Sequence, residues 1–181
     1  SSESAAVDSL RQRFLAFAID VNKDLDRCGF PLCKGNIMAS NPQWCLTLDE
    51  WREQFTSWIR VPHPEALLNA SIFFDFRSLF GKAELADAMR RHLLAQAAAT
   101  PMFLQAMSRI ALDVEPPLGK IRDFLTDLEP DHPGKIDLKK YGSRIFVDVA
   151  RIYALATGVH NTNSAQRLRL SGKSDPGKPG P

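Results

Sequence analysis

The sequence has few cysteines, and no two of them stand at the spacing of a recognised pair. The three cysteines among the 181 residues are Cys28, Cys33 and Cys45. An odd count without a Cys-x-x-Cys spacing argues against a disulfide framework and against a zinc site. The four histidines are too scattered along the chain to indicate a metal site. We therefore expect a protein of a reducing compartment, the cytoplasm.

Long apolar runs and a strong excess of charge are missing as well. No apolar run approaches the roughly 18 residues that cross a membrane, and the stretch SSESAAVDSLRQRF lacks the basic start and apolar run of a signal peptide. The formal net charge of +2 is too small to indicate nucleic acid as the main partner. With 44% apolar and 24% charged residues, the composition is that of a globular protein with one large domain, or a domain and an appendage.

An apolar stripe with helical spacing opens the chain. Its members follow one another at intervals of three or four residues: Val7, Leu10, Phe14, Phe17, Val21, Leu25 and Cys28. This spacing predicts a long helix, and Gly29 follows where a C-capping glycine belongs. The stripe resembles a coiled-coil seam, but we favour a helix that lays this face on a core.

Breaker and capping residues mark the next elements. Pro31, Gly35 and Pro42 exclude a helix and leave room for a small strand pair near residues 30–40. Thr47 and Glu50 have the spacing of a capping box and predict the start of a helix. The apolar face of that helix is aromatic and is expected in the core: Leu48, Trp51, Phe55, Trp58 and Ile59.

Residues 64–80 allow two interpretations. The stretch SIFFDFR alternates poorly as a strand, whereas a helix has Pro64 in its first turn and Gly81 just past its end. We expect the helix, with one apolar face made of Leu68, Ile72, Phe76, Leu79 and Phe80. Further helices are expected over residues 82–99, 101–113, 118–128 and 144–157, and after the cap residues HNTN. The predicted fold class is mainly α, a bundle of about seven or eight helices with at most a small strand pair.

Several stretches occur in an order that resembles a known family. They are GFPLCKGNIMASNPQW, WREQFTSWIRVPHPEALLNASIFFDFRSLFGKAELA, PPLGKI, IDLKKYG, DVARIYAL and RLRL. On these motifs, the chain from about residue 10 to 170 resembles the C-terminal part of the bacterial nucleotidyltransferases associated with cyclic-nucleotide-binding and CBS domains in signalling proteins. A more distant similarity is to PII uridylyltransferases and glutamine-synthetase adenylyltransferases, with matching positions at Arg77, Gly81, Lys139, Gly142 and Asp148.

The resemblance implies a domain organisation and a set of partners. Residues 1–45 would be a long helix and the remnant of the catalytic domain, 46–170 a helical substrate-binding domain, and 171–181 a flexible tail. The full-length enzyme would use Mg²⁺ and a nucleoside triphosphate, and this part would hold no cofactor. The implied partners are the N-terminal catalytic domain, regulatory CBS or cyclic-nucleotide-binding domains, and an acceptor protein or small molecule. We expect no nucleic acid and no membrane as partner, and a homodimer stays open.

The motif that holds the metal in such enzymes is missing. They use a Gly-Ser turn followed by paired Asp residues, because carboxylates are the hard oxygen ligands that Mg²⁺ requires. No Asp pair follows Gly142 and Ser143, and residues 30–40 carry no third carboxylate. We therefore expect a fragment that is inactive alone. The alternative is a non-catalytic signalling module that docks a partner or dimerises through its first helix.

Seven charged residues are candidates for binding substrate or nucleotide: Lys34, Asp75, Arg77, Asp137, Lys139, Asp148 and Arg151. Each also has a plainer interpretation, as part of a surface turn, a solvated helix side, a loop or an i,i+3 surface pair. The helix that carries Asp148 and Arg151 is otherwise apolar, and a buried charge is costly unless it is paired. We expect these two at the border of the apolar face, where they organise the IDLKKYG loop. Lys139 would then face the cleft that the catalytic part closes, with Arg77 close to it.

Overall fold

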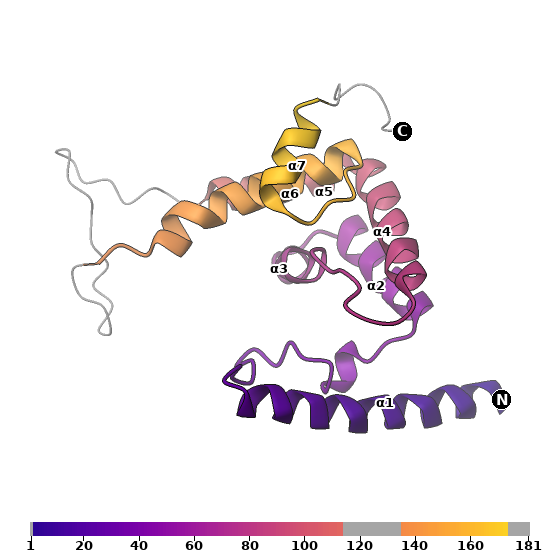
Figure 1. The fold of residues 1–181 in the computed structure, drawn as a ribbon. Helices are drawn as coiled ribbons and strands as arrows, with labels where there is room; N and C mark the ends of the chain where they lie inside the picture. Colours follow the sequence, from indigo (N-terminus) through magenta and orange to yellow (C-terminus); the bar gives the residue numbers. More distant parts are fainter. Residues whose placement is uncertain (1, 114–134, 174–181) are drawn as a thin grey trace. The chain divides into compact units, whose positions relative to one another are not determined.

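The computed structural model describes residues 2–113 and 135–173, and these ranges contain seven α-helices and no β-strand (Figure 1). The fold class is therefore mainly α, as the sequence predicts. None of the helices in these ranges is both long and apolar enough to cross a membrane. The chain divides into two units, residues 1–51 and 52–181, which we describe separately. The helix predicted over 118–128 lies outside the described residues, and the predicted domain boundary after residue 45 stays a prediction.

A single long helix dominates unit 1. α1 (Ser2–Arg27) ends where the sequence predicts, and Gly29 just past it has φ = +91°, a conformation that other residues rarely adopt. The chain then returns along one side of α1 and forms the 3-10 turn η1 (Pro42–Trp44). Asn22 on α1 donates from Nδ2 to Oγ of Ser40 over 2.8 Å, which fixes this return.

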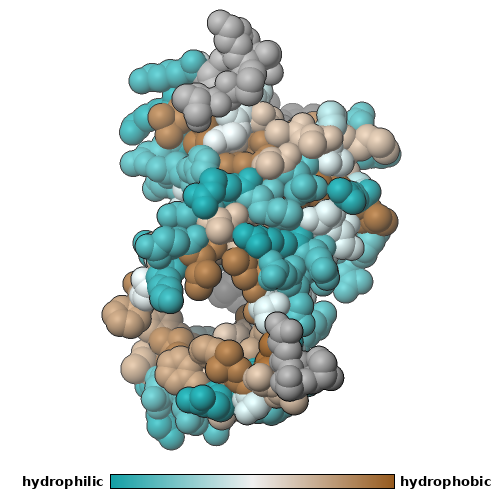
Figure 2. Space-filling view, turned by 90° about the vertical axis from the view of Figure 1, so that its right-hand side faces the viewer, coloured by the Kyte–Doolittle hydropathy of each residue, from teal (hydrophilic) through white to brown (hydrophobic). Residues whose placement is uncertain are grey.

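The face of α1 that unit 1 buries is not the predicted one. Leu15 and Ala18 are buried, on the side that also carries Asn22, whereas Phe14 and Phe17 are 56% and 65% exposed. Figure 2 shows apolar side chains gathered over the part of the view that unit 1 occupies. The returning loop packs beside the apolar stripe and leaves most of it open. The expectation that this stripe lies on a core is therefore wrong for the described residues.

Helix α2 (Leu48–Arg60) begins with the predicted capping box. The N–H of Glu50 donates to Oγ1 of Thr47 over 3.2 Å, and Oε2 of Glu50 accepts the N–H of Thr47 over 2.7 Å. These two bonds satisfy backbone donors that the start of a helix otherwise leaves open. Three members of the predicted aromatic face are buried: Phe55, Trp58 and Ile59.

Unit 2 is built around an aromatic core. Phe74 and Phe103 are fully buried, and the ring centroid of Phe74 lies 4.9 Å from that of Phe55 and 6.0 Å from that of Phe103. The helices that follow α2 in this unit are α3 (Pro64–Phe73), α4 (Ala83–Ala98), α5 (Pro101–Leu112), α6 (Arg144–Thr157) and α7 (Ser164–Ser171). α6 packs against α4, α5 and α7 and is therefore the central helix of the unit.

The predicted helix over residues 64–80 is too long. α3 ends at Phe73, because Arg90 on α4 donates to the carbonyl oxygens of Phe74, over 2.6 Å, and of Phe76. These carbonyls are thereby bound to a side chain and not to a further helical turn. The buried face of α3 is also rotated from the predicted one, since it consists of Ala66, Leu67 and Ala70. Of the predicted face, Leu79 and Phe80 lie beyond the helix and are exposed.

α6 has the bounds that the sequence predicts. It ends at Thr157, and Gly158 follows with φ = +72°. A π-helical turn, η2 (Lys139–Ser143), leads into it. Oδ1 of Asp137 accepts the backbone N–H groups of Lys139 and Lys140, over 2.8 and 2.9 Å, and so caps this turn.

Candidate functional site

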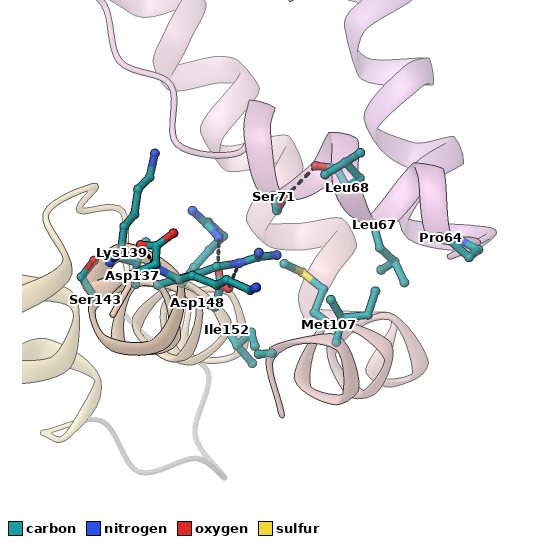
Figure 3. A pocket seen from close by; sticks show the side chains of 16 residues that line it. Pro64, Leu67, Leu68, Ser71, Met107, Asp137, Lys139, Ser143, Asp148 and Ile152 are labelled. Atoms are coloured by element: carbon teal, nitrogen blue, oxygen red, sulfur yellow. Dashed lines mark hydrogen bonds and ion pairs between the residues drawn. The ribbon is translucent and has the colours of Figure 1, made fainter. Parts of the chain in front are cut away.

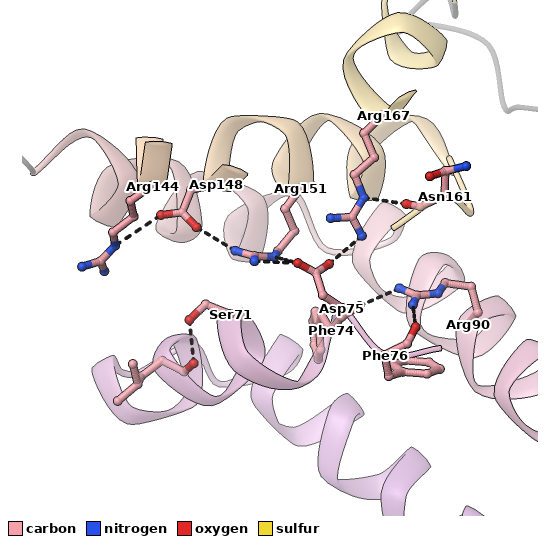
Figure 4. Close-up of polar contacts among 11 residues, drawn as sticks. Ser71, Phe74, Asp75, Phe76, Arg90, Arg144, Asp148, Arg151, Asn161 and Arg167 are labelled. Carbon is pink, nitrogen blue, oxygen red and sulfur yellow. Dashed lines mark hydrogen bonds and ion pairs between the residues drawn. The ribbon is translucent and has the colours of Figure 1, made fainter. Parts of the chain in front are cut away.

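A buried ion-pair network joins α6 to the segment that follows α3. Arg151 on α6 donates from Nη2 and Nε to Oδ2 of Asp75, over 2.7 and 3.1 Å (Figure 4). It also donates from Nη1 to Oδ1 of Asp148 over 2.7 Å. The side chain of Arg151 is only 7% exposed. Because a guanidinium presents its donors in a rigid fork, Arg151 fixes the direction of both carboxylates.

A second arginine reaches the same carboxylate from α7. Nη2 of Arg167 forms an ion pair with Oδ1 of Asp75 at 2.6 Å, at angles outside those of a hydrogen bond, and Nε donates to the carbonyl of Asn161 over 2.6 Å. The remaining nitrogen, Nη1, is buried and has no hydrogen-bond partner within the described ranges. Asp75 thus ties both α6 and α7 to the segment after α3.

Buried positive charge exceeds buried negative charge around Asp75. Burial by itself would raise the pKa of Asp75, but the hydrogen bonds of Arg151 and the close positive charges of Arg151 and Arg167 hold this pKa below its ordinary value. Burial lowers the pKa of Arg90 on α4, and the neighbouring charge of Arg167 lowers it further. Asp75 is therefore ionised at neutral pH and is the counter-ion of several arginines.

A cavity of about 610 Å³ opens beside this network. Residues of α3 and α5 give it an apolar wall: Pro64, Leu67, Leu68, Met107, Ile110 and Ala111. Residues of η2, α6 and the turn before them give it a polar side: Asp137, Lys139, Lys140, Ser143, Arg144, Asp148 and Arg151. Figure 3 shows Leu67 and Pro64 across the cavity from Asp137 and Lys139. Its volume lies in the range of small-molecule sites, roughly 300–1,000 Å³.

The carboxylates at the cavity are already engaged. Asp137 accepts two backbone N–H groups, and Asp148 lies 2.7 Å from Arg151 and 3.6 Å from Nε of Arg144. By contrast, the ammonium of Lys139 has no hydrogen bond or ion pair with any residue of the described ranges. Cationic side chains therefore outnumber carboxylates in the lining: Lys139, Lys140, Arg144 and Arg151 against Asp137 and Asp148.

The structure brings most of the predicted site residues together. Four of them line the cavity, namely Asp137, Lys139, Asp148 and Arg151. Asp75 does not line it but accepts a hydrogen bond from Arg151. The hydrogen bonds of Arg151 reach Asp75 and Asp148 and none goes to the IDLKKYG loop. The expectation that this arginine organises the loop is therefore wrong, because Asp137 caps the loop instead.

Two predicted residues lie elsewhere. Arg77 is exposed and lines a separate hollow of about 290 Å³, together with Arg90 and His160. Lys34 lies on an exposed turn of unit 1, two residues before Asn36, whose φ is +54°. The prediction that Arg77 lies at the same cleft as Lys139 is wrong for the cavity described here.

Sequence reasoning missed three arginines of the site. Arg144 stands four residues before Asp148, a spacing that brings side chains together on a helix, and this signal was available. Arg90 and Arg167 carry no such local signal, since their partners lie in the segment after α3. The apolar wall was missed as well, because the predicted face of α3 was rotated from the real one.

The fold and the cavity define a helical domain with a ligand-sized site backed by buried arginines. Comparison with protein families adds two matches. Residues 3–65 match the model described as "Putative nucleotidyltransferase DUF294", and residues 101–174 match "Putative nucleotidyltransferase substrate binding domain". The second match covers α5, η2, α6 and α7, which form much of the cavity and its backing.

The chain is thus similar to the nucleotidyltransferase model over residues 3–65 and to the substrate-binding model over residues 101–174. No curated protein and no solved structure matches the chain. The similarity of this chain to known proteins therefore rests on these two family models.

Proposed function

We propose that unit 2 is the substrate-binding part of a nucleotidyltransferase, and that its cavity holds the substrate. The observation that carries this proposal is the cavity itself. It has the size of a small-molecule site, four of the seven predicted binding residues line it, and much of its lining comes from the segment that matches the substrate-binding model. Its role would be to position the reacting group, on which transfer of a nucleotidyl group strongly depends.

The described residues of unit 2, 52–113 and 135–173, do not fit a magnesium site. Asp75 and Asp148 are bound by arginines, and Asp137 by backbone N–H groups. No group of three His, Cys, Asp or Glu residues within the described ranges is arranged to hold a metal. Mg²⁺ and the nucleoside triphosphate would therefore bind to a catalytic part of a longer protein. That protein would be a bacterial cytoplasmic signalling enzyme of the PII-uridylyltransferase type, and it would also carry CBS or cyclic-nucleotide-binding domains.

A cavity-filling variant tests the proposal in the longer protein. Leu68 is 56% exposed and lines the cavity, so Leu68→Trp places an indole there at little cost to the fold. Leu85 on α4 is 54% exposed and does not line the cavity, so Leu85→Trp is the matched control. We expect Leu68→Trp to reduce nucleotide transfer at least tenfold and Leu85→Trp to keep it. Transfer at the wild-type rate in Leu68→Trp would refute the proposal.

The second candidate function is a non-catalytic module that dimerises through α1. The open stripe of α1, with Phe14 and Phe17 more than half exposed, favours it. Sedimentation velocity of the chain and of Phe17→Glu separates the two functions. A dimer that Phe17→Glu dissociates supports the module, and a monomer at all concentrations excludes this mode of association.

A further inference from the structure

We propose that the cavity of unit 2 takes a small organic anion, with an apolar body on the wall of α3 and α5 and a phosphate or carboxylate group at Lys139 and Arg144. This inference rests on the proposed function, because it names the substrate class of the same cavity. It follows from how the two kinds of lining residue are separated in space and from which charged groups are still unpaired.

The apolar wall is both fixed and accessible. Leu67, Met107 and Ala111 are nearly buried, so their positions are set by packing in the unit. Leu68 and Ile110, on the same wall, are 56% and 38% exposed, so apolar surface is left open toward the cavity. A ligand with an apolar body would remove this surface from water, which favours binding in proportion to the area covered.

The charges across the cavity select the sign of the ligand. Oδ1 of Asp137 accepts two backbone N–H groups of η2, and Oδ1 of Asp148 accepts a hydrogen bond from Arg151. Against these two carboxylates the lining has four cations, Lys139, Lys140, Arg144 and Arg151, so positive charge is in excess. Lys139 has no partner among the residues that the structure describes, and Arg144 touches Asp148 only at 3.6 Å with half its side chain exposed. Two cations at one edge of an apolar cavity attract an anion, and the guanidinium can bind it through two parallel hydrogen bonds.

The same arrangement disfavours a cationic ligand or a metal ion. At Asp148, such a ligand would have to compete with Arg151, whose side chain is 93% buried and would then lose a hydrogen-bonded counter-ion. Removing one partner from a buried ion pair is strongly unfavourable, because it leaves a charge uncompensated. The backing network thus makes Arg144 and Lys139 the groups that a ligand meets.

Titration of the whole chain with a minimal amphiphilic anion tests the proposal. Phenyl phosphate joins a planar apolar body to a phosphate, and phenol and inorganic phosphate are its two halves. Isothermal titration calorimetry measures the affinity of each probe, and the backbone amide NMR shifts of an isotope-labelled sample locate the site. We expect phenyl phosphate to bind at least tenfold more tightly than either half, with shifts at Lys139 and Met107. Benzoate distinguishes a carboxylate ligand from a phosphate ligand.

Two double variants distinguish a specific anion site in the cavity from a general effect of the protein's net charge on binding. Lys139→Ala with Arg144→Gln removes two positive charges that line the cavity. Lys135→Ala with Arg109→Gln removes two that do not line it. We expect the first pair to weaken phenyl phosphate about tenfold or more, because two charges at contact distance act through partly dehydrated surroundings. The second pair should change binding less than twofold.

Three results would overturn the proposal: phenyl phosphate no tighter than phenol, an equal effect of the two variant pairs, or no binding of phenyl phosphate. None of these results contradicts the proposed function, which is tested separately by nucleotide transfer in the longer protein with Leu68→Trp. Conversely, anion binding by the chain together with full transfer in Leu68→Trp would refute the proposed function and leave the anion site standing.

Discussion

Arg151 and Asp75 are 76 positions apart in the sequence, and Nη2 of Arg151 lies 2.7 Å from Oδ2 of Asp75. This contact links the central helix α6 to the segment that follows α3, and Asp75 also forms an ion pair with Arg167 on α7. The network therefore holds three separate segments of unit 2 in register. It also forms the back of the cavity, because Arg151 lines the cavity as well.

Arg151→Ala should destabilise the protein by about 3–5 kcal/mol, because it leaves Asp75 and Asp148 without their main counter-ion in a largely buried place. Arg144→Ala removes the same charge from a half-exposed position of the same helix and should cost only about 0–1 kcal/mol. Urea denaturation followed by circular dichroism measures both values. Equal midpoints for the two variants would show that the buried network adds nothing to stability.

Stability should depend on pH through Asp75. Its pKa is lowered in the folded protein, so its ion pairs contribute fully above the ordinary value of 3.8 and are lost as pH falls through the lower native value. Asp75→Asn lacks this carboxylate. The free-energy difference between the wild type and Asp75→Asn should thus be constant above about pH 5 and shrink below about pH 4. A gap that stays the same from pH 7 to pH 3 would contradict this assignment.

The capping box of α2 should have a measurable effect of its own. Thr47→Ala removes the side-chain oxygen that accepts the N–H of Glu50, and we expect a loss of about 1 kcal/mol in the free energy of unfolding. Thr47→Ser keeps the oxygen and should stay within a few tenths of a kcal/mol of the wild type. Chemical denaturation of the three proteins checks this order, and a Ser variant as unstable as the Ala variant would exclude the cap as the cause.

The chain by itself should transfer no nucleotide. It lacks the Gly-Ser turn with its following Asp pair, and Asp75, Asp137 and Asp148 are engaged in hydrogen bonds. Incubation with labelled ATP or UTP, Mg²⁺ and candidate acceptors should give no more label than a blank. A longer gene product with an intact upstream motif is the positive control, and label above the blank with the chain alone would refute the prediction.

Lys139→Ala should leave the fold intact, because the ammonium of Lys139 has no partner in the described part of the chain and the capping bond uses its backbone. The melting temperature should change by less than one or two degrees, as is usual for surface substitutions. In the longer protein the same variant should lower transfer, most visibly as a higher KM for the acceptor. Unchanged transfer at every acceptor concentration would remove Lys139 from the binding residues.

Local sequence determined the helices and several of their ends. Thr47 with Glu50, Gly29 and Gly158 act on backbone groups within a few residues of themselves, so their effect is readable from the sequence and the structure confirms it. The i,i+3 spacing of Asp148 and Arg151 likewise predicted a pair that the structure contains. The mainly helical class followed from the same periodic patterns.

Tertiary packing decided where α3 ends, which face of α1 is buried and what Arg151 binds. Arg90 takes the carbonyls of Phe74 and Phe76 from another helix, and a local pattern cannot contain that competitor. Asp75 meets Arg151 and Arg167 only after α6 and α7 have packed on the segment after α3. A buried charge is stable only with its counter-ion beside it, so these partners depend on contacts that form between segments far apart in the chain.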